Sequence, residues 1–441
     1  MGNLQPPAAG PESEVVGLCR DLIRIDTTNY GDDSGPGERE AAEHVAGLLS
    51  EVGLEPRLLE SAPRRTSVAA RLDGSDGSRA DALLLHGHLD VVPAEPKVWR
   101  YDPWAAEVAD GCVWGRGAID MKDMDAMILS VVRARLREDR LPARPVVVCF
   151  TADEEAGGVL GAHWLVENHP ELFEGCTEAV GEVGGFSVTL PDGGRTYLVQ
   201  TAEKGIAWIT VQAEGTEGHG SLPHADNAIA TLSRALARVA DHVWPTEVTP
   251  TMAELLALTA EATGSHLDPD DVDAVRAVLG SVARIVTATT RNTANPTVLR
   301  AGHKTNQVPA SAVAHIDGRF LPGRREEFLA TLDSLLGERV HRIDTYTDTA
   351  LEVPFGGPTV AAMTAALAET DPGCRVAPYM LFGGTDAKAF SRLGIRGYGF
   401  SPLRLPPDLD FPALFHGVDE RVPVDALTFG ARTLDRFLDL C

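Results

Sequence analysis

Short apolar runs alternate with helical stripes along the first 200 residues. The runs at 82–85 and 145–151 are continuously apolar or nearly so, which is typical of buried strands. Apolar residues spaced three or four apart predict helices at 38–53, 121–138 and 159–168. Because strands and helices alternate, we expect an α/β layer with a mostly parallel central sheet.

The middle of the chain has a different pattern. Residues 204–214 alternate in the manner of a strand, and the mixed stretch 245–290 predicts two helices. The other elements predicted there are helices at 227–243 and 324–336 and strands at 297–301 and 312–320. This order predicts a small α+β insert with an antiparallel sheet. The α/β pattern resumes near residue 352 and ends in a helix at 425–440.

Length and composition limit the classes of partner. A chain of 441 residues, 44% of them hydrophobic, is long enough for two or more domains. Its net charge of −25 disfavours nucleic acid and anionic membranes as partners. The six cysteines have no paired spacing, so we expect reduced thiols and a cytoplasmic protein. No apolar run approaches the length of a membrane span.

The first candidate cluster follows the strand at 82–85. His86, His88 and Asp90 occupy alternate positions of an extended segment, so they face the same way. His88 could bind a metal while Asp90 steadies its other ring nitrogen. The alternative is a structural histidine at the end of a strand, an interpretation that suits His86 well.

Two further clusters carry carboxylates at the starts of predicted helices. Asp120 and Asp123 could simply cap and begin a helix, but Asp120 could also bridge two metals with its two oxygens. Glu154 and Glu155 follow a buried strand, and the helix dipole alone would favour acids there. In the functional interpretation one of the two binds metal and the other transfers a proton. Their order in the sequence does not assign these roles.

Two weaker signals complete the set. Glu182 lies in AVGEVGG, with Glu178 as a rival, and His416 lies in LFHGVDE. Imidazoles and carboxylates are the ligands that a pair of zinc-like ions needs, with one carboxylate left for proton transfer. The chain is therefore predicted to be a metal-dependent hydrolase.

The ordered motifs HGHLDVVP, GRGAIDMKD, ADEEAGG, GEVGG and HGVDE resemble those of the co-catalytic zinc hydrolases. That family includes aminoacylases, acetylornithine deacetylase, succinyl-diaminopimelate desuccinylase, dipeptidases and glutamate carboxypeptidase. The resemblance covers roughly residues 13–440. It implies a zinc-peptidase-like catalytic domain formed by 1–200 and 352–441, interrupted by a lid and dimerisation domain at 201–351.

The resemblance also implies a role for each motif residue. Two Zn²⁺ ions, with Co²⁺ or Mn²⁺ as alternatives, would each have one histidine and one glutamate and would share an aspartate. These ligands would be His88 with Glu182, His416 with Glu155, and Asp120 as the bridge. Asp90 would orient His88, and Glu154 would be the general base. The peptide bond between Asp120 and Met121 would be cis.

Residues of the lid and of a glycine-rich loop would contact the substrate. His219 in GHGS would reach the active site of the partner in a homodimer and polarise the scissile carbonyl. Asn306 and Arg319 would grip a substrate carboxylate, and the loop with Gly384 and Thr385 would lie near it. The alternatives are a structural ion pair for Arg319 and a helix cap for Thr385.

We therefore expect an enzyme that cleaves an amide bond of a small substrate with a free carboxylate. The substrate would be a dipeptide, a C-terminal residue or an N-acyl amino acid, attacked by a water that bridges the metals. One alternative is an N-acyl amino acid synthase/hydrolase acting mainly in condensation. A non-catalytic metal-binding homologue is the other alternative, although every matching position keeps a suitable side chain.

Overall fold

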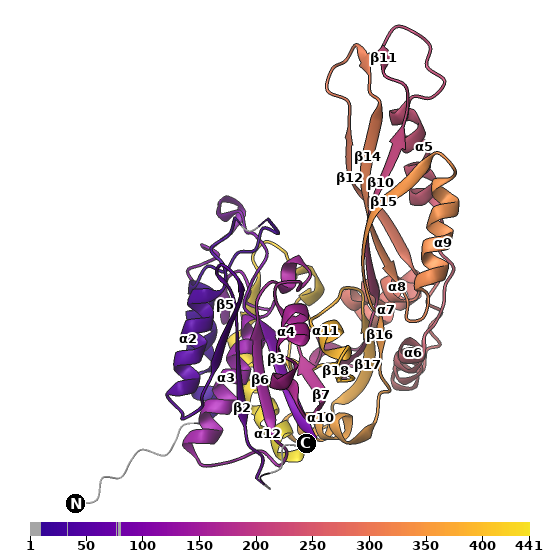
Figure 1. The fold of residues 1–441 in the computed structure, drawn as a ribbon. Helices are drawn as coiled ribbons and strands as arrows, with labels where there is room; N and C mark the ends of the chain where they lie inside the picture. Colours follow the sequence, from indigo (N-terminus) through magenta and orange to yellow (C-terminus); the bar gives the residue numbers. More distant parts are fainter. Residues whose placement is uncertain (1–9, 33, 76, 78–80) are drawn as a thin grey trace, which may run out of the picture.

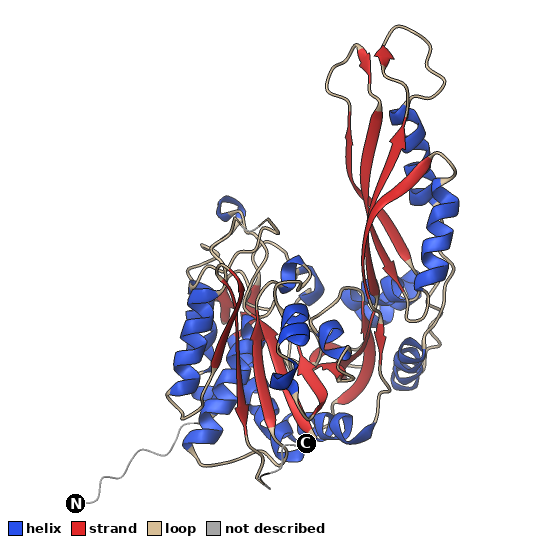
Figure 2. Ribbon diagram, viewed as in Figure 1, coloured by secondary structure: helices blue, strands red, loops and turns tan. Residues whose placement is uncertain are grey.

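Two β-sheets organise the molecule (Figure 1). The computed structural model describes residues 10–441, apart from 33, 76 and 78–80. The larger sheet lies in the α/β part, which also contains the C-terminus, and the smaller sheet extends away from it (Figure 2). Among the described residues, no helix combines the length and apolar character needed to cross a membrane.

The large sheet has the strand order β1-β2-β6-β3-β7-β18-β9-β16, with β8 and β17 also paired to β9. Its strands are β1 (Arg57–Ala62), β2 (Arg65–Leu72), β3 (Ala82–His88), β6 (Val146–Thr151), β7 (Cys176–Gly181), β8 (Phe186–Thr189), β9 (Arg195–Glu203), β16 (Leu351–Glu352), β17 (Arg375–Leu381) and β18 (Arg396–Gly399). The four central strands, β6, β3, β7 and β18, run parallel, which confirms the predicted mostly parallel centre.

Helices cover both faces of this sheet because its central strands are apolar on both sides. Leu83 and Leu85 of β3 pack into one core, whereas Leu84 packs into the core on the opposite face. The first face carries α1 (Val15–Arg24), α2 (Arg39–Ser50), α3 (Lys122–Arg137), α10 (Gly357–Thr370) and α12 (Val424–Leu440). The second carries α4 (Ala162–Asn168) and α11 (Ala387–Ser391).

The small sheet is antiparallel, in the order β12-β14-β10-β15. Its strands are β10 (Gly205–Glu214), β12 (Thr293–Ala301), β14 (Ser311–Phe320) and β15 (Val340–Asp348). Helices α5 (Ala228–Asp241) and α9 (Arg325–Leu336) cover one face and enclose a separate core. The short pair β11 (Gly218–His219) and β13 (Gln307–Val308) lies at the far tip (Figure 1).

The stretch 245–290 forms three α-helices rather than the two predicted. They are α6 (Pro250–Thr263), α7 (Val272–Leu279) and α8 (Ala283–Thr289). Thr249 begins α6, since its hydroxyl accepts the N–H of Met252. The apolar faces of these helices join the core of the large sheet, with α6 and α8 packed against β17. This segment therefore lies at the base of the small sheet, not along it.

A third small sheet brings two distant segments together. It has the order β19-β5-β4, formed by β4 (Glu107–Ala109), β5 (Cys112–Trp114) and β19 (Arg421–Pro423). Because Val422 pairs with Val113, the segment before β19 lies beside the segment after β5. The remaining elements are short 3-10 helices: η1 (Pro11–Ser13), η2 (Pro96–Val98), η3 (Glu154–Ala156), η4 (Pro170–Phe173), η5 (Gly280–Val282) and η6 (Phe411–Ala413).

Candidate active site

The five predicted metal ligands come from five separate segments at one edge of the large sheet. His88 ends β3, Glu155 lies on η3 just after β6, and Glu182 directly follows β7. Asp120 precedes α3, and His416 precedes β19. The carboxyl ends of parallel strands are the usual ligand edge of an α/β sheet. The peptide bond between Asp120 and Met121 is cis, as predicted.

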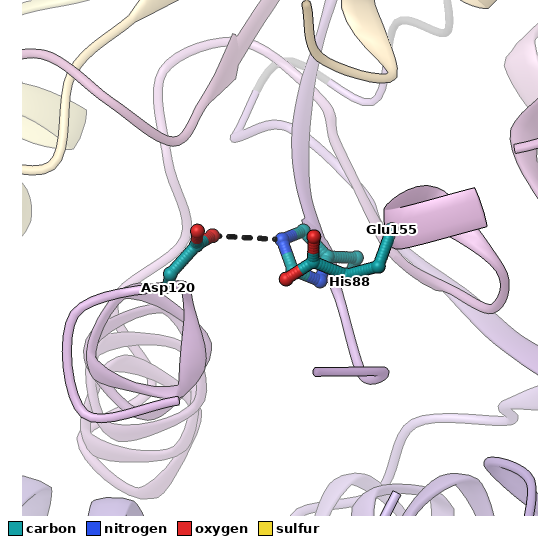
Figure 3. A group of neighbouring side chains, drawn as sticks. All are labelled: His88, Asp120 and Glu155. Atoms are coloured by element: carbon teal, nitrogen blue, oxygen red, sulfur yellow. Dashed lines mark hydrogen bonds and ion pairs between the residues drawn. The ribbon is translucent and has the colours of Figure 1, made fainter. Parts of the chain in front are cut away.

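The His88 imidazole is held between its own strand end and the acidic cluster. Its Nδ1 donates to the backbone carbonyl of Asp90 at 2.9 Å. Its Nε2 lies 3.2 Å from Oδ1 of Asp120, the contact drawn in Figure 3, and 3.6 Å from Oε2 of Glu182. Oε2 of Glu154 is 4.0 Å from the same nitrogen. The ring therefore points one nitrogen at three carboxylates.

His416 approaches the same cluster from the opposite end of the chain. Its Nε2 lies 3.2 Å from Oδ2 of Asp120 and 3.1 Å from Oε2 of Glu155. Asp120 thus turns one oxygen toward His88 and the other toward His416. This is the arrangement that a carboxylate shared by two cations requires.

The donor set fits two divalent cations. Ligand atoms of His88, Asp120 and Glu155 lie within 4.8 Å of one another, as do those of His88, Glu154 and Glu182. The second oxygen of Glu155 is buried without a hydrogen-bond partner, which leaves it free to bind an ion. Mixed imidazole and carboxylate donors suit zinc and similar ions.

Burial and crowding shift the protonation of these groups. Burial, with a contribution from the Glu182 carboxylate, raises the pKa of Glu154 well above its ordinary value. Burial also raises the pKa of Glu182 to about 8. The hydrogen bonds of His416 to Asp120 and Glu155 raise the pKa of its imidazole to about 10. The cluster thus attracts positive charge, which is the property a cation site needs.

Asp90 has a contact that its position in the sequence does not reveal. Its carboxylate lies 3.6 Å from Nδ1 of His88, and its two oxygens accept the backbone N–H groups of Glu154 and Glu155 at 3.0 and 3.1 Å. Asn29 donates to the same carboxylate at 2.9 Å. Asp90 therefore fixes the turn that carries both glutamates, besides lying beside His88.

A buried ion pair connects the loop that carries Asp120 with the loop that carries His416. The Arg116 guanidinium lies 2.5 Å from Oε2 of Glu420, whose other oxygen accepts the N–H of Ile119 at 2.8 Å. Arg116 also donates to the carbonyl of Gly417 at 3.1 Å. Both residues lie inside the motifs GRGAIDMKD and HGVDE, but only the pairing of β5 with β19 brings them into contact.

A cavity of about 320 Å³ opens over the cluster. Its lining includes the predicted substrate residues Arg319, Gly384 and Thr385. Arg319 pairs with Asp317 at 2.6 Å, so it lines the cavity and also makes the alternative structural ion pair. The Thr385 hydroxyl accepts the N–H of Ala387, the first residue of α11, although Asp386 occupies the N-cap position of that helix.

Two predicted residues lie elsewhere. His219 and Asn306 are neighbours at the far tip of the small sheet, where the N–H of Gly220 donates to the carbonyl of Asn306 at 2.9 Å. His219 is exposed, and its Nδ1 lies 2.8 Å from the Ser221 hydroxyl. In the described part of the chain, neither His219 nor Asn306 is among the residues that line the cavity.

The two remaining alternatives are structural residues. His86 is buried and packs edge-on against Phe390, and burial lowers the pKa of its imidazole to about 3. Glu178, the rival of Glu182, is bound by Arg144 at 2.8 Å and Arg396 at 3.0 Å. Neither side chain belongs to the groups of candidate metal ligands found among the described residues.

The chain is similar to several known proteins. The succinyl-diaminopimelate desuccinylase of Methylobacterium sp. (strain 4-46) is 30% identical, with 96% of this chain and 95% of that protein covered. The N-fatty-acyl-amino acid synthase/hydrolase PM20D1 of Xenopus tropicalis is 25% identical over 94% of this chain and 83% of that protein. An M20 family metallo-carboxypeptidase structure from Sulfolobus solfataricus has the same fold, with a TM-score of 0.73, 16% identity and 97% and 99% of the two chains covered.

The match to a family model covers the large sheet except β1, β2 and the start of β3, and it includes the small sheet and all five candidate ligands. Residues 84–440 match the model described as peptidase family M20/M25/M40. Enzymes of this family hydrolyse amide or peptide bonds of small substrates with the help of bound metal. The protein is a metallohydrolase that belongs to peptidase family M20/M25/M40.

Proposed function

We propose that the protein hydrolyses the amide bond of a small substrate with a free carboxylate, using two Zn²⁺ ions held by the five clustered ligands. The observation that carries the proposal is Asp120, which turns one oxygen to each imidazole while Glu154 stands beside the cluster. His88 and Glu182 would hold one ion, and Glu155 and His416 the other. Co²⁺ or Mn²⁺ are alternatives with the same ligands.

Glu154 is the proposed general base. Two bound cations would lower the pKa of a water and polarise the scissile carbonyl. Glu154 accepts the proton of the attacking water and passes it to the leaving nitrogen. Its position supports this role, because Asp90 accepts the N–H of Glu154 and so fixes the start of its turn.

Residues 201–351 form the proposed lid, in which the small sheet extends away from the large one while α6–α8 pack into the core of the large sheet. Arg319 lines the cavity and would bind the substrate carboxylate, with Gly384 and Thr385 on the facing loop. His219 and Asn306 lie too far along the lid to line the cavity of their own chain, and we propose that they act in the partner's site of a homodimer. His219 would polarise the carbonyl there, a contribution of about 3 kcal/mol for such a donor.

The cell compartment proposed for the enzyme is the cytoplasm. The six cysteines are unpaired thiols: Cys19, Cys112, Cys149, Cys176, Cys374 and Cys441. Unpaired thiols are typical of reducing compartments. Burial raises the pKa of the Cys149 thiol above its ordinary value, which keeps it protonated and unreactive.

A second candidate is the reverse reaction, condensation of an acid with an amino acid. The similarity to PM20D1, a synthase/hydrolase by name, favours it. The same residues would serve both directions, because Glu154 would then take a proton from the attacking amine. Assays started from the amide, and separately from acid plus amine, distinguish the two.

The test compares the purified enzyme with its Glu154→Gln and Glu155→Ala variants. Dipeptides and N-acyl amino acids serve as substrates, with chelated enzyme as the control. Glu154→Gln should keep its metal and lose several decades of turnover, whereas Glu155→Ala should lose metal. A Glu154→Gln enzyme as fast as the parent would overturn the assignment of the base.

A further inference from the structure

Much of the cavity wall beyond the acidic cluster is apolar. Phe186 and Leu381 contribute from the large sheet, and Phe415 from the loop that carries His416. Phe186 and Phe415 both pack on Phe411, with ring centroids 4.9 and 5.1 Å away, so the two cavity-lining rings belong to one aromatic cluster. A cavity with one reactive polar end and an apolar wall is typical of sites that bind part of a ligand by its hydrophobic surface.

The helical segment α6–α8 supplies another part of this wall. Ile285 of α8 lines the cavity and is 4% exposed, and α8 packs against β17, the strand that ends in Leu381. Ile285 comes from a segment that carries none of the predicted site residues. Its side chain can therefore change the shape of the cavity without touching the reacting atoms.

The small sheet supplies an aromatic pair on the other side. Trp208 and Tyr346 lie with ring centroids 5.3 Å apart, and the Tyr346 hydroxyl donates to the carbonyl of Gly157 at 3.4 Å. A Cβ atom on Gly157 would lie 3.4 Å from the Trp208 ring. Gly157 is three residues after Glu154, so this pair lies close to the proposed base. Trp208 remains 39% exposed, which leaves ring surface for a ligand.

Among the described residues, the cavity is lined by two basic side chains of lysine or arginine type, Arg319 and Lys388, and Arg319 is the one proposed to bind the free carboxylate of the substrate, so neither remains for a second charged group. Arg319 pairs with Asp317, and Lys388 is held by Glu203 at 3.3 Å. A charged substituent placed against Ile285 and Phe186 would lose its hydration without gaining a partner there, which is costly. An aliphatic or aromatic substituent would gain from the same burial.

We propose that the preferred substrate carries a large aliphatic or aromatic group beside the scissile amide, and that Ile285 limits the size of this group. The inference rests on the proposed amide hydrolysis and adds the class of substrate. The apolar group can belong to the acyl half or to the side chain of the amino acid half. The two sources share the same chemistry, and two series of substrates separate them.

The acyl series is N-acetyl-, N-succinyl- and N-octanoylalanine, and the amine series is N-acetylalanine, N-acetylleucine and N-acetylphenylalanine. In at least one series, kcat/KM should rise about tenfold or more from the smallest to the largest apolar group. N-succinylalanine, although larger than N-acetylalanine, should be the poorer substrate. A preference for the succinyl compound, or equal rates throughout both series, overturns the inference.

Ile285 is tested by changes in both directions. Ile285→Ala should shift the preference toward larger groups, and Ile285→Phe should reduce kcat/KM for the largest group about tenfold relative to the smallest. Ile343→Ala and Ile343→Phe are the matched controls, because Ile343 is 55% exposed on β15 and lies outside the cavity lining. If the Ile285 and Ile343 variants have the same size profile, Ile285 does not set the limit.

Binding separates this inference from the proposed function. Calorimetry with the Glu154→Gln protein measures the affinity of N-octanoylalanine, N-acetylphenylalanine and N-acetylalanine without turnover. Tighter binding of a large apolar compound, weakened by Ile285→Phe introduced into the same protein, supports the inference even if the native enzyme cleaves none of these amides. Hydrolysis of the amides without any such preference leaves the proposed function standing and overturns the inference.

Discussion

Glu420 forms a buried ion pair with Arg116, with 2.5 Å between Oε2 and Nη1, although 304 residues separate them along the chain. Through Ile119 N–H and Gly417 C=O, the pair holds the residue before Asp120 and the residue after His416. Two ligands of the proposed metal centre are therefore positioned by one interaction that touches neither ion.

The Glu420→Gln variant should lose both stability and metal. Removing one partner of a buried ion pair leaves the other charge uncompensated, at a cost of about 3–5 kcal/mol. Urea unfolding measures the loss, and metal analysis measures occupancy, which should fall as the loops of Asp120 and His416 loosen. The control is Glu369→Gln, because the pair of Glu369 with Arg436 is exposed and should contribute at most about 1 kcal/mol. Equal losses in the two variants would contradict the positioning role.

Removing metal should destabilise the folded protein. The carboxylates of Glu154, Glu155 and Glu182 are crowded and buried or partly buried, and bound cations would neutralise their mutual repulsion. An ion present at a hundredfold excess over its Kd contributes about 2.7 kcal/mol to folding. Thermal unfolding before and after dialysis against a chelator should therefore show a lower Tm, restored by added Zn²⁺.

The Asp120→Asn protein is the control for this experiment, because it keeps the shape of the shared ligand but not its charge. Added Zn²⁺ should raise its Tm much less than that of the parent. If chelation leaves the Tm of the parent unchanged, the cluster does not hold structural or catalytic metal under those conditions.

Lys388 joins both connections between the two sheets. Its ammonium donates to the carbonyl of Lys204, where β9 passes into β10, and to that of Thr349, between β15 and β16. Glu203 lies 3.3 Å from the same nitrogen and also accepts from the Thr385 hydroxyl. One buried charge thus links the base of the small sheet to the loop that contains Gly384.

The Lys388→Met variant should loosen the two connections between the sheets. Glu203 would be left buried without its cation, at a cost of about 3 kcal/mol or more. Amide hydrogen exchange should accelerate in the two connections, while the far strands of the large sheet keep their protection. Lys304→Met is the control, since Lys304 is exposed near the tip of the small sheet. Unchanged rates of amide hydrogen exchange at both connections would show that Lys388 does not stabilise them.

The sequence predicted the α/β alternation because the central strands are almost continuously apolar. The run at 82–85 lies within β3, and the helix predicted at 121–138 corresponds to α3. His88, Asp120, Glu154 and Glu155 stood out in the sequence because they lie next to apolar runs, whereas Glu182, His416 and the ligand roles of all five residues were predicted from the resemblance of the ordered motifs to the family. Local hydrophobic pattern and the order of the motifs were thus enough to predict the α/β part and the candidate ligands.

Long-range packing could not be predicted from the sequence pattern in the same way. An apolar helical stripe in 245–290 does not say which core it joins, so the packing of α6–α8 on β17 was missed. Arg116 and Glu420 are partners only because β19 returns to β5 at the end of the chain. The support of Asp90 for the turn at Glu154 depends on the spacing of β3 and β6. These contacts arise from topology, which hydrophobic periodicity does not determine.

His219 offers the sharpest test of assembly. It is exposed at the tip of the small sheet and lies outside the lining of its own cavity, and its proposed role is in the site of a second copy of the chain. His219→Ala should lower kcat while metal content stays unchanged. Mixing the His219→Ala and Glu154→Gln proteins, after dissociation and reassembly, should restore activity, because one site of each mixed dimer has both residues intact. With random pairing of a symmetric dimer, about a quarter of all sites should be active.

The control mixes Glu154→Gln with Glu155→Ala, two defects of the same site, and should recover nothing. Equal activity in the two mixtures would place His219 outside the partner's reaction.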